Sequence, residues 1–220
     1  MKKQNPSFRF SSRSLPTSGY ALQKKDLPRA AEVMARAFFH DPSIRFLCGG
    51  QTTGPHDREY FRAVLKSLSG EALILATDEA VGDRLVLLPP GSRDISPLRF
   101  FQNGGLKLLG LFGPGLFLRS LRYENNCQKI QDRVAPREAW TCLCFVVAPE
   151  RQGRGEGSRL MKPLLRALDE RGIPLYLETH RERNLEIYRH YGFEEADVSR
   201  IPKTNIRQYA LLRKAREPLE

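Results

Sequence analysis

The sequence predicts an α/β fold, and three observations lead to that prediction. Residues 140–150, "WTCLCFVVAPE", form a continuous apolar run, as expected of a strand that is buried on both faces. The glycine-rich stretch "RQGRGEG" (151–157) follows at once, and the next segment carries apolar residues at helical spacing. A second strand, "IPLYLET" (173–179), completes a βαβ unit of about the usual size.

Composition sets the outer limits. The chain has 220 residues, of which 40% are hydrophobic and 28% charged, as in a globular protein of one domain or one domain with an insertion. The most apolar segment, 104–118, contains Lys107, Pro114 and five glycines. We therefore expect a core helix or a segment covering a pocket there, and no membrane contact.

The formal net charge of +11 is unevenly distributed. Residues 1–25 carry six Lys or Arg and no acid, which leaves 30 basic and 25 acidic residues and a net charge of +5 in the rest. Residues 1–17 are consistent with a disordered arm, a tail that touches nucleic acid or a transit-like leader, and we favour disorder. We expect one domain over 18–215 and a tail over 216–220, and no nucleic-acid partner.

The first half predicts mostly helices around a hairpin. A short strand is expected at 20–23, and a helix opened by Asp26 and Pro28 carries a broad apolar stripe. Pro42 and Gly49-Gly50 indicate a loop, and a second helix is expected at 57–68. Residues 71–91 read as a β-hairpin that turns near Gly82, and 92–135 are partly helical and broken by glycines.

The second half predicts the rest of the βαβ unit and a final strand. The helix over 158–172 has one apolar face, formed by Leu160, Met161, Leu164, Leu165 and Leu168, and Pro163 should bend it. A short helix ends at Gly192, and a last strand is expected at 205–213. We see no internal repeat.

The cysteines and histidines indicate no metal site. The four cysteines are scattered and show no spacing typical of disulfide pairs, which favours reduced thiols in a cytoplasmic protein; they are Cys48, Cys127, Cys142 and Cys144. Cys142 and Cys144 should share one face of a strand. The four histidines add no spacing that would complete a set of metal ligands, so we expect both thiols to be core or pocket groups.

The glycine loop predicts phosphate binding, because glycines let the backbone approach closely and the start of a helix favours an anion. A P-loop needs Lys followed by Ser or Thr after its last glycine, but Gly157 is followed by Ser158 and Arg159. A Rossmann loop has G-x-G-x-x-G spacing near the start of its fold, whereas the spacing here is G-x-G-x-G in the last third of the chain.

Several motifs in one order carry a family resemblance. They are Trp140, then Val147-Ala148-Pro149, Q-x-x-G-x-G from Gln152 to Gly157, "PLYLE" at 174–178, and Asn184, Tyr188 and Gly192-Phe193. This order resembles the GNAT superfamily of acetyl-CoA-dependent N-acetyltransferases, closest to the branch typified by puromycin N-acetyltransferase. The matched stretch, 140–193, is about a quarter of the chain.

The resemblance implies a fold and a cofactor site. It implies a central, mixed and mostly antiparallel twisted sheet of about seven strands, flanked by helices, with a splayed parallel pair of strands at the acetyl-CoA site. It implies that backbone groups of Val146 and Val147 pair with the pantetheine arm and that Asn184 contacts that arm. The amides that would hold the pyrophosphate are those of Gln152, Gly153, Arg154, Gly155, Glu156, Gly157 and Ser158.

The resemblance makes Tyr188 the general acid that protonates the departing thiolate, and a neutral tyrosine suits that role. The alternative is a packing aromatic residue. Glu178 is our candidate for the general base, acting directly or through water; alternatively it caps a turn or pairs with Arg181. We interpret Glu182, Glu186 and His190 as solvated residues and Tyr191 as a packing residue.

Glu156 departs from the pattern, because relatives commonly have an aliphatic residue there. A carboxylate is costly to bury without a partner. We expect its side chain to turn outward to Arg154, Arg159 or solvent while its N–H faces the phosphate.

The leading hypothesis is an N-acetyltransferase that moves the acetyl group of acetyl-CoA directly to a primary amine of a small molecule in a ternary complex. A protein or peptide amine is an alternative acceptor. A non-catalytic acyl-CoA sensor and a nucleic-acid-binding protein are the alternatives from other classes. A homodimer is left open, and the sequence does not identify the acceptor.

Overall fold

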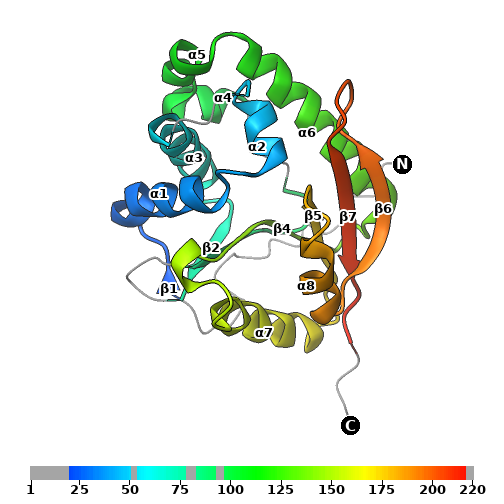
Figure 1. The fold of residues 1–220 in the computed structure, drawn as a ribbon. Helices are drawn as coiled ribbons and strands as arrows, with labels where there is room; N and C mark the ends of the chain where they lie inside the picture. The colour runs from blue at the N-terminus through cyan, green and yellow to red at the C-terminus, as the bar shows by residue number, and fades with distance from the viewer. Residues whose placement is uncertain (1–19, 51–53, 78–82, 93–96, 217–220) are drawn as a thin grey trace, which may run out of the picture.

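The computed structural model describes residues 20–50, 54–77, 83–92 and 97–216. It contains a seven-stranded sheet with helices on both faces (Figure 1). The arm at 1–17, the hairpin turn with Gly82 and the tail from 217 onward lie outside the described residues. Within the described part, no helix is both long and apolar enough to span a bilayer.

The sheet is mixed and mostly antiparallel, as the resemblance implied. Its order is β1-β2-β3-β4-β5-β7-β6, and only β4 and β5 run parallel to each other. The strands are β1 Tyr20–Ala21, β2 Leu73–Ala76, β3 Arg84–Leu88, β4 Trp140–Val146, β5 Leu175–Thr179, β6 Glu194–Arg200 and β7 Arg207–Arg213. The hairpin and the βαβ unit, β4-α7-β5, are therefore confirmed.

Two helical layers cover the sheet. In Figure 1 six helices lie above it: α1 Leu27–Ala37, α2 Pro42–Leu47, α3 Pro55–Leu68, α4 Pro97–Phe100, α5 Leu106–Phe112 and α6 Gly115–Val134. Two helices lie below it: α7 Glu156–Asp169 and α8 Asn184–His190. Because strand side chains alternate between faces, Val86 and Leu88 of β3 pack with α1 and α3, whereas Leu85 and Leu87 pack with α7.

The apolar stripes predicted from the sequence are the buried faces of these helices. Alanines and Met34 of α1 pack against Phe61 and Leu65 of α3, all almost fully buried. The five apolar residues predicted for α7 are all buried beneath the sheet beside Trp140. Pro163 lies inside α7, which continues past it to Asp169.

Three elements differ from the predictions. The expected loop near Pro42 contains α2, because the Asp41 carboxylate accepts hydrogen bonds from the amides of Ser43 and Ile44 and Pro42 suits the first helical position. The 92–135 region ends in α6, a helix of 20 residues that the surrounding glycines concealed. The motifs quoted for the chain also omitted β6, whose sequence is EEADVSR.

The sheet edges are short or polar. β1, at one edge, has two residues in the described part of the chain. β6, at the other edge, pairs with β7 on one side and exposes Glu194 and Glu195. Arg133 of α6 forms an ion pair with Asp197 of β6 at 2.6 Å, which ties this edge to the upper helical layer.

Candidate active site

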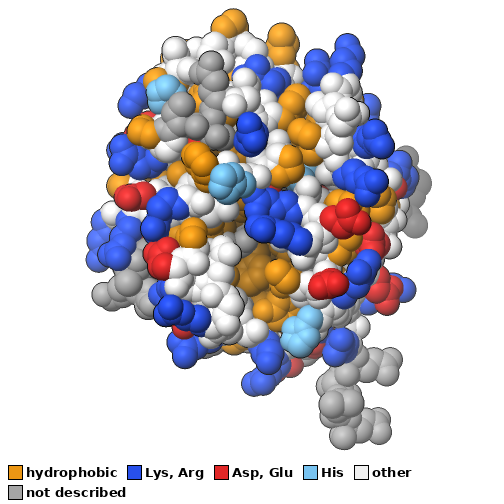
Figure 2. All heavy atoms as spheres, viewed as in Figure 1, with side chains coloured by type: hydrophobic (Ala, Val, Ile, Leu, Met, Phe, Trp, Pro, Cys, Tyr) orange, Lys and Arg blue, Asp and Glu red, His pale blue; other side chains and the backbone are white. Residues whose placement is uncertain are grey.

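The parallel strands β4 and β5 separate partway along their length. Their pairing ends at Cys142 and Leu177, yet β4 continues to Val146 beside β3, and β5 continues to Thr179 beside β7. A cleft of about 510 Å³ opens at the end of this gap, between α1, the glycine loop and α8. Figure 2 shows it as a hollow with an apolar floor in the lower half of the molecule. The splayed strand pair is thus present.

A β-bulge lies at the point of separation. Val86 of β3 is opposite Cys144, and Leu87 is opposite Cys142, so Leu143 is the extra residue in β4. The extra residue reverses the alternation of faces: Cys142 packs with α7, whereas Cys144 packs with the α1–α3 cluster. The prediction that these thiols share a face was therefore wrong.

The glycine loop forms one wall of the cleft. A 3-10 turn over Pro149–Arg151 leads into Gly153 and Gly155, which both have φ of +76°, and α7 begins at Glu156. Gly157 lies directly against β4, because a Cβ there would be 2.8 Å from Cζ of Phe145. The free N-terminal amides of α7 and its dipole therefore start beside the end of β4, where an anion would be stabilised.

Most of the predicted cofactor residues line this cleft: Val146, Val147, Gln152, Gly153, Gly155, Glu156, Gly157, Ser158 and Asn184. Arg154 is exposed and is not among the lining residues. The Ser158 amide already donates to the carbonyl of Gly155. Ser158 presents its hydroxyl instead, 3.0 Å from the hydroxyl of Tyr191.

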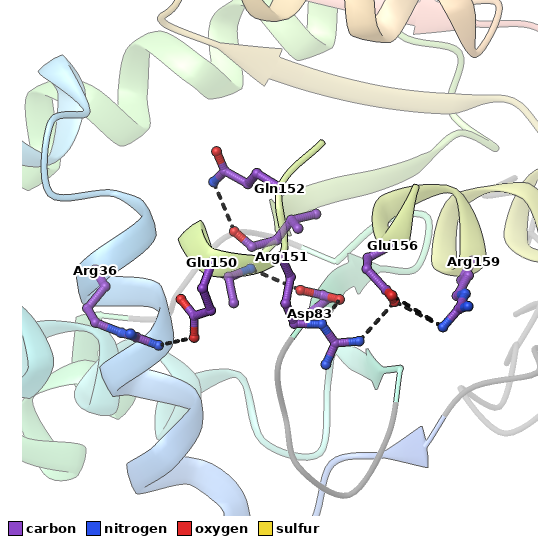
Figure 3. A network of polar contacts seen from close by, with 9 residues as sticks. Arg36, Asp83, Glu150, Arg151, Gln152, Glu156 and Arg159 are labelled. Atoms are coloured by element: carbon purple, nitrogen blue, oxygen red, sulfur yellow. Dashed lines mark hydrogen bonds and ion pairs between the residues drawn. The ribbon is translucent and has the colours of Figure 1, made fainter. Parts of the chain in front are cut away.

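Glu156 does not turn outward as expected. Its side chain is only 14% exposed, and it accepts a hydrogen bond of 2.8 Å from Nη2 of Arg151 and one of 3.3 Å from Arg159 (Figure 3). Arg159 was a predicted partner, but Arg151 takes the place predicted for Arg154. A short ion pair removes the penalty that burial of an unpartnered carboxylate would carry.

Asn184 and Tyr188 are one turn apart on α8 and both line the cleft. Nδ2 of Asn184 donates to Oγ1 of Thr179, which fixes the amide beside the end of β5. Burial, followed by the nearby Cys142, Cys144 and Asp41, raises the pKa of Tyr188 far above its ordinary value. The Tyr188 hydroxyl therefore keeps its proton at neutral pH and is available as a donor.

Glu178 lies on the other face of the sheet, under α6, and does not line the cleft. It accepts hydrogen bonds from the Tyr176 hydroxyl at 2.5 Å and from Nε2 of Gln208 at 2.6 Å. It does not pair with Arg181, whose Nε lies 3.5 Å from Oδ2 of Asp41. Both donors to Glu178 are uncharged.

Besides Arg151, four polar side chains that line the cleft were not predicted as site residues. Asp41, Arg181 and Arg183 line the cleft together with Tyr191. Figure 2 shows basic side chains at the upper rim of the hollow. Two arginines directly before Asn184, in "HRERN", are a sequence signal that could have identified this rim. Tyr191 also packs against Phe145, so the predicted packing role is correct but incomplete.

His180 is a fifth unpredicted residue near the gap. Its ring lies 5.5 Å from that of Tyr123 of α6, and its Nε2 is buried without a hydrogen-bond partner in the described structure. Burial lowers the pKa of His180, although Asp41 and Glu178 oppose the shift. The imidazole is therefore neutral at neutral pH. Glu182, Glu186 and His190 are exposed, as predicted.

Comparison with known proteins defines the class. Residues 123–195 match the family model of the acetyltransferase (GNAT) domain. An uncharacterized N-acetyltransferase of Schizosaccharomyces pombe is 28% identical over 184 residues, which cover 78% of this chain and 72% of that protein. Residues 123–195, which include β4, the glycine loop, α7, β5 and α8, thus match a GNAT acetyltransferase domain, as the resemblance implied.

Solved structures share the fold. One is described as histone acetyltransferase HPA2 and related acetyltransferase from Corynebacterium glutamicum, with a TM-score of 0.60 and 16% identity over 93% of this chain and 99% of that one. Another is arylalkylamine N-acetyltransferase 2 from Aedes aegypti, with a TM-score of 0.57 and 12% identity over 90% and 98%. Likeness to the puromycin branch stays a prediction.

Proposed function

We propose that the protein transfers the acetyl group of acetyl-CoA to a primary amine of a small molecule, by direct transfer in a ternary complex. One observation carries the proposal: a tyrosine that retains its proton, Tyr188, lines the same cleft as the splayed end of β4 and the N-terminus of α7. We treat residues 18–215 as the single domain that does this.

The residues of the cleft suit a CoA thioester. Its volume of about 510 Å³ is in the range of small-molecule sites. The close packing of Gly157 on β4 leaves no room for a side chain, so backbone amides face the ligand. Arg181 and Arg183 add positive charge at the rim.

Each part of the ligand has its own contact in this proposal. Backbone groups of Val146 and Val147, freed from β5 by the splay, pair with the pantetheine amides. Asn184, held by Thr179, contacts the same arm. The amides of the loop from Gln152 to the start of α7 hold the pyrophosphate, and bound acetyl-CoA supplies the activated acetyl group.

Two residues handle protons. Tyr188 donates its hydroxyl proton to the sulfur as the C–S bond breaks, and a donor there stabilises the developing negative charge. The proton of the attacking amine has two candidate acceptors. His180 is neutral and follows β5 directly, whereas Glu178 lies outside the cleft on the other face of the sheet and would reach the amine only through a chain of water molecules. An amine must lose a proton to give a stable amide, so one of these groups has to accept it.

We favour a small-molecule acceptor because two side chains meet in the cleft beside the gap between β4 and β5 and limit the room there. Asp41 at the start of α2 and Arg181 after β5 lie 3.5 Å apart across it, and their side chains are only 9% and 16% exposed. A protein acceptor would have to insert a single lysine side chain or an extended N-terminus into the cleft beside this contact. Cytoplasmic location and a homodimer stay predictions.

The test is Tyr188→Phe. We expect turnover of acetyl-CoA with an accepting amine, followed as free thiol release, to fall by about 10²–10⁴-fold, the typical contribution of a proton donor. The dissociation constant for CoA should stay within about twofold, because the ring is retained.

Tyr191→Phe is the matched control, because it removes a hydroxyl from the phosphate side of the same cleft. It should change CoA affinity more than turnover. Unchanged turnover in Tyr188→Phe would remove the proposed acid. Thermal stabilisation by CoA without turnover of any amine in a broad panel would favour a sensor.

A further inference from the structure

The glycine loop is held at its neck by one ion pair. Arg151 ends the 3-10 turn, and Glu156 begins α7, so their 2.8 Å contact joins the two ends of the segment 152–155 (Figure 3). Two of the four residues inside this segment are glycines with positive φ. Such a segment would otherwise sample many conformations.

A buried carboxylate anchors the neck to the sheet. Asp83, directly before β3, is fully buried, and its Oδ1 accepts a hydrogen bond of 2.9 Å from the amide of Ala148. Its Oδ2 lies 3.3 Å from Nε of Arg151. Arg151 therefore lies between Asp83 and Glu156 and connects the sheet to the first residue of α7, as Figure 3 shows.

A preformed loop matters for affinity. Fixing the backbone of a flexible segment costs conformational entropy, and a ligand that has to order the loop itself loses this from its binding free energy. The contacts among Asp83, Arg151 and Glu156, which we call the loop clamp, order the loop when the protein folds, so the ligand does not have to order it. Against this, the Glu156 carboxylate lines the cleft and would repel a phosphate.

We propose that the loop clamp consists of positioning residues that preform the glycine loop for the pyrophosphate of the acyl donor, so that the preference for CoA over donors without a pyrophosphate depends on them. The inference rests on the proposed function. It also predicts that Glu156→Ile weakens CoA binding, although relatives commonly have an aliphatic residue at this position. Preorganisation outweighs the repulsion between Glu156 and phosphate.

Two substitutions of opposite charge separate these effects. Glu156→Gln and Arg151→Gln both break the clamp, but the first raises the net charge by one and the second lowers it by one. We expect both to weaken CoA binding by about tenfold in calorimetric titration. The double variant should resemble either single variant, because the pair acts as a unit.

The second ligand is pantetheine, with S-acetylpantetheine as donor. Neither has a pyrophosphate, so the affinity for pantetheine and the KM for S-acetylpantetheine should change much less in the variants than the affinity for CoA. Amide hydrogen exchange at 152–156 in the ligand-free protein should be faster in both variants. Glu150→Gln is the matched control, because it breaks an exposed pair with Arg36 one residue away and should change none of these values.

The outcomes are distinct. Tighter CoA binding in Glu156→Gln with weaker binding in Arg151→Gln would show simple electrostatics and overturn the inference. Equal losses with CoA and pantetheine, or unchanged hydrogen exchange, would also overturn it. A wild type that binds no CoA would overturn the proposed function, and with it the link to pyrophosphate, whereas unchanged variants of a CoA-binding wild type would overturn the clamp alone.

Discussion

Replacing Gly157 with alanine tests how closely α7 must approach β4. The added Cβ would lie 2.8 Å from Cζ of Phe145 and 3.2 Å from Cγ2 of Val147. Ordinary contact begins near 3.4 Å, so the helix or the Phe145 ring must move by about 0.6 Å. Overpacking of this kind costs about 1–3 kcal/mol. The movement displaces the start of α7 and the Val147 side of the cleft, so we expect CoA binding to weaken by about tenfold.

Urea unfolding and calorimetric titration with CoA measure the two effects separately. Gly172→Ala is the control: it introduces a side chain at φ +66° into open space after α7, so it should cost about 1 kcal/mol of stability with no change in CoA affinity. Wild-type CoA affinity in Gly157→Ala would refute the reasoning, because the clash lies between residues of the cleft wall.

Two further predictions concern stability. Burial raises the pKa of Asp169, but bonds from Arg213 at 2.7 Å and from the Arg216 amide outweigh it and lower the pKa below its ordinary value. Because the folded-state pKa lies below the unfolded-state pKa of near 4, the charged carboxylate stabilises the fold above that pH. This stabilisation is lost as the pH falls through the folded-state pKa. Asp169→Asn should therefore reduce the unfolding free energy by about 3 kcal/mol at pH 7 and flatten its acid dependence; a parallel acid profile in urea titrations would contradict this. Pro163→Ala should add about 1 kcal/mol to the unfolding free energy with no effect on CoA binding, because it restores a donor to the helix; a loss of stability would show that the Pro163 ring packs better than alanine.

Sequence alone predicted the elements whose pattern is strong and local. The apolar stripe of α7 repeats the helical period, and the continuous run of β4 has the length of a buried strand and is followed by Pro149 and the glycine loop. α6 was missed because Gly113 and Gly115 at its start are helix breakers, while tertiary contacts of Leu116 and Ile130 hold the helix in place. β6 was missed because its charged residues carry no apolar alternation.

The part of the site that follows the motif spacing of the family resemblance was predictable. The glycine loop, Asn184 and Tyr188 follow a spacing that the chain displays, and the structure brings them to one cleft. The bond from Gln208 to Glu178 was not predictable, because it comes from β7, and neither was the contact of Arg151 with Asp83, which lies directly before β3. The bulge at Leu143 was also hidden, since an extra residue is defined only by the neighbouring strand.

The polar edge of the sheet limits how copies of this protein can meet. Growth of a β-ladder from one molecule to the next needs a long, exposed strand with a neutral surface. The described part of β1 has two residues, and in a parallel, in-register arrangement an approaching copy of β6 would bring Glu194 and Glu195 toward their own counterparts. Like charges directly opposite each other on paired strands are destabilising. The folded protein should therefore resist parallel, in-register fibril growth along β6.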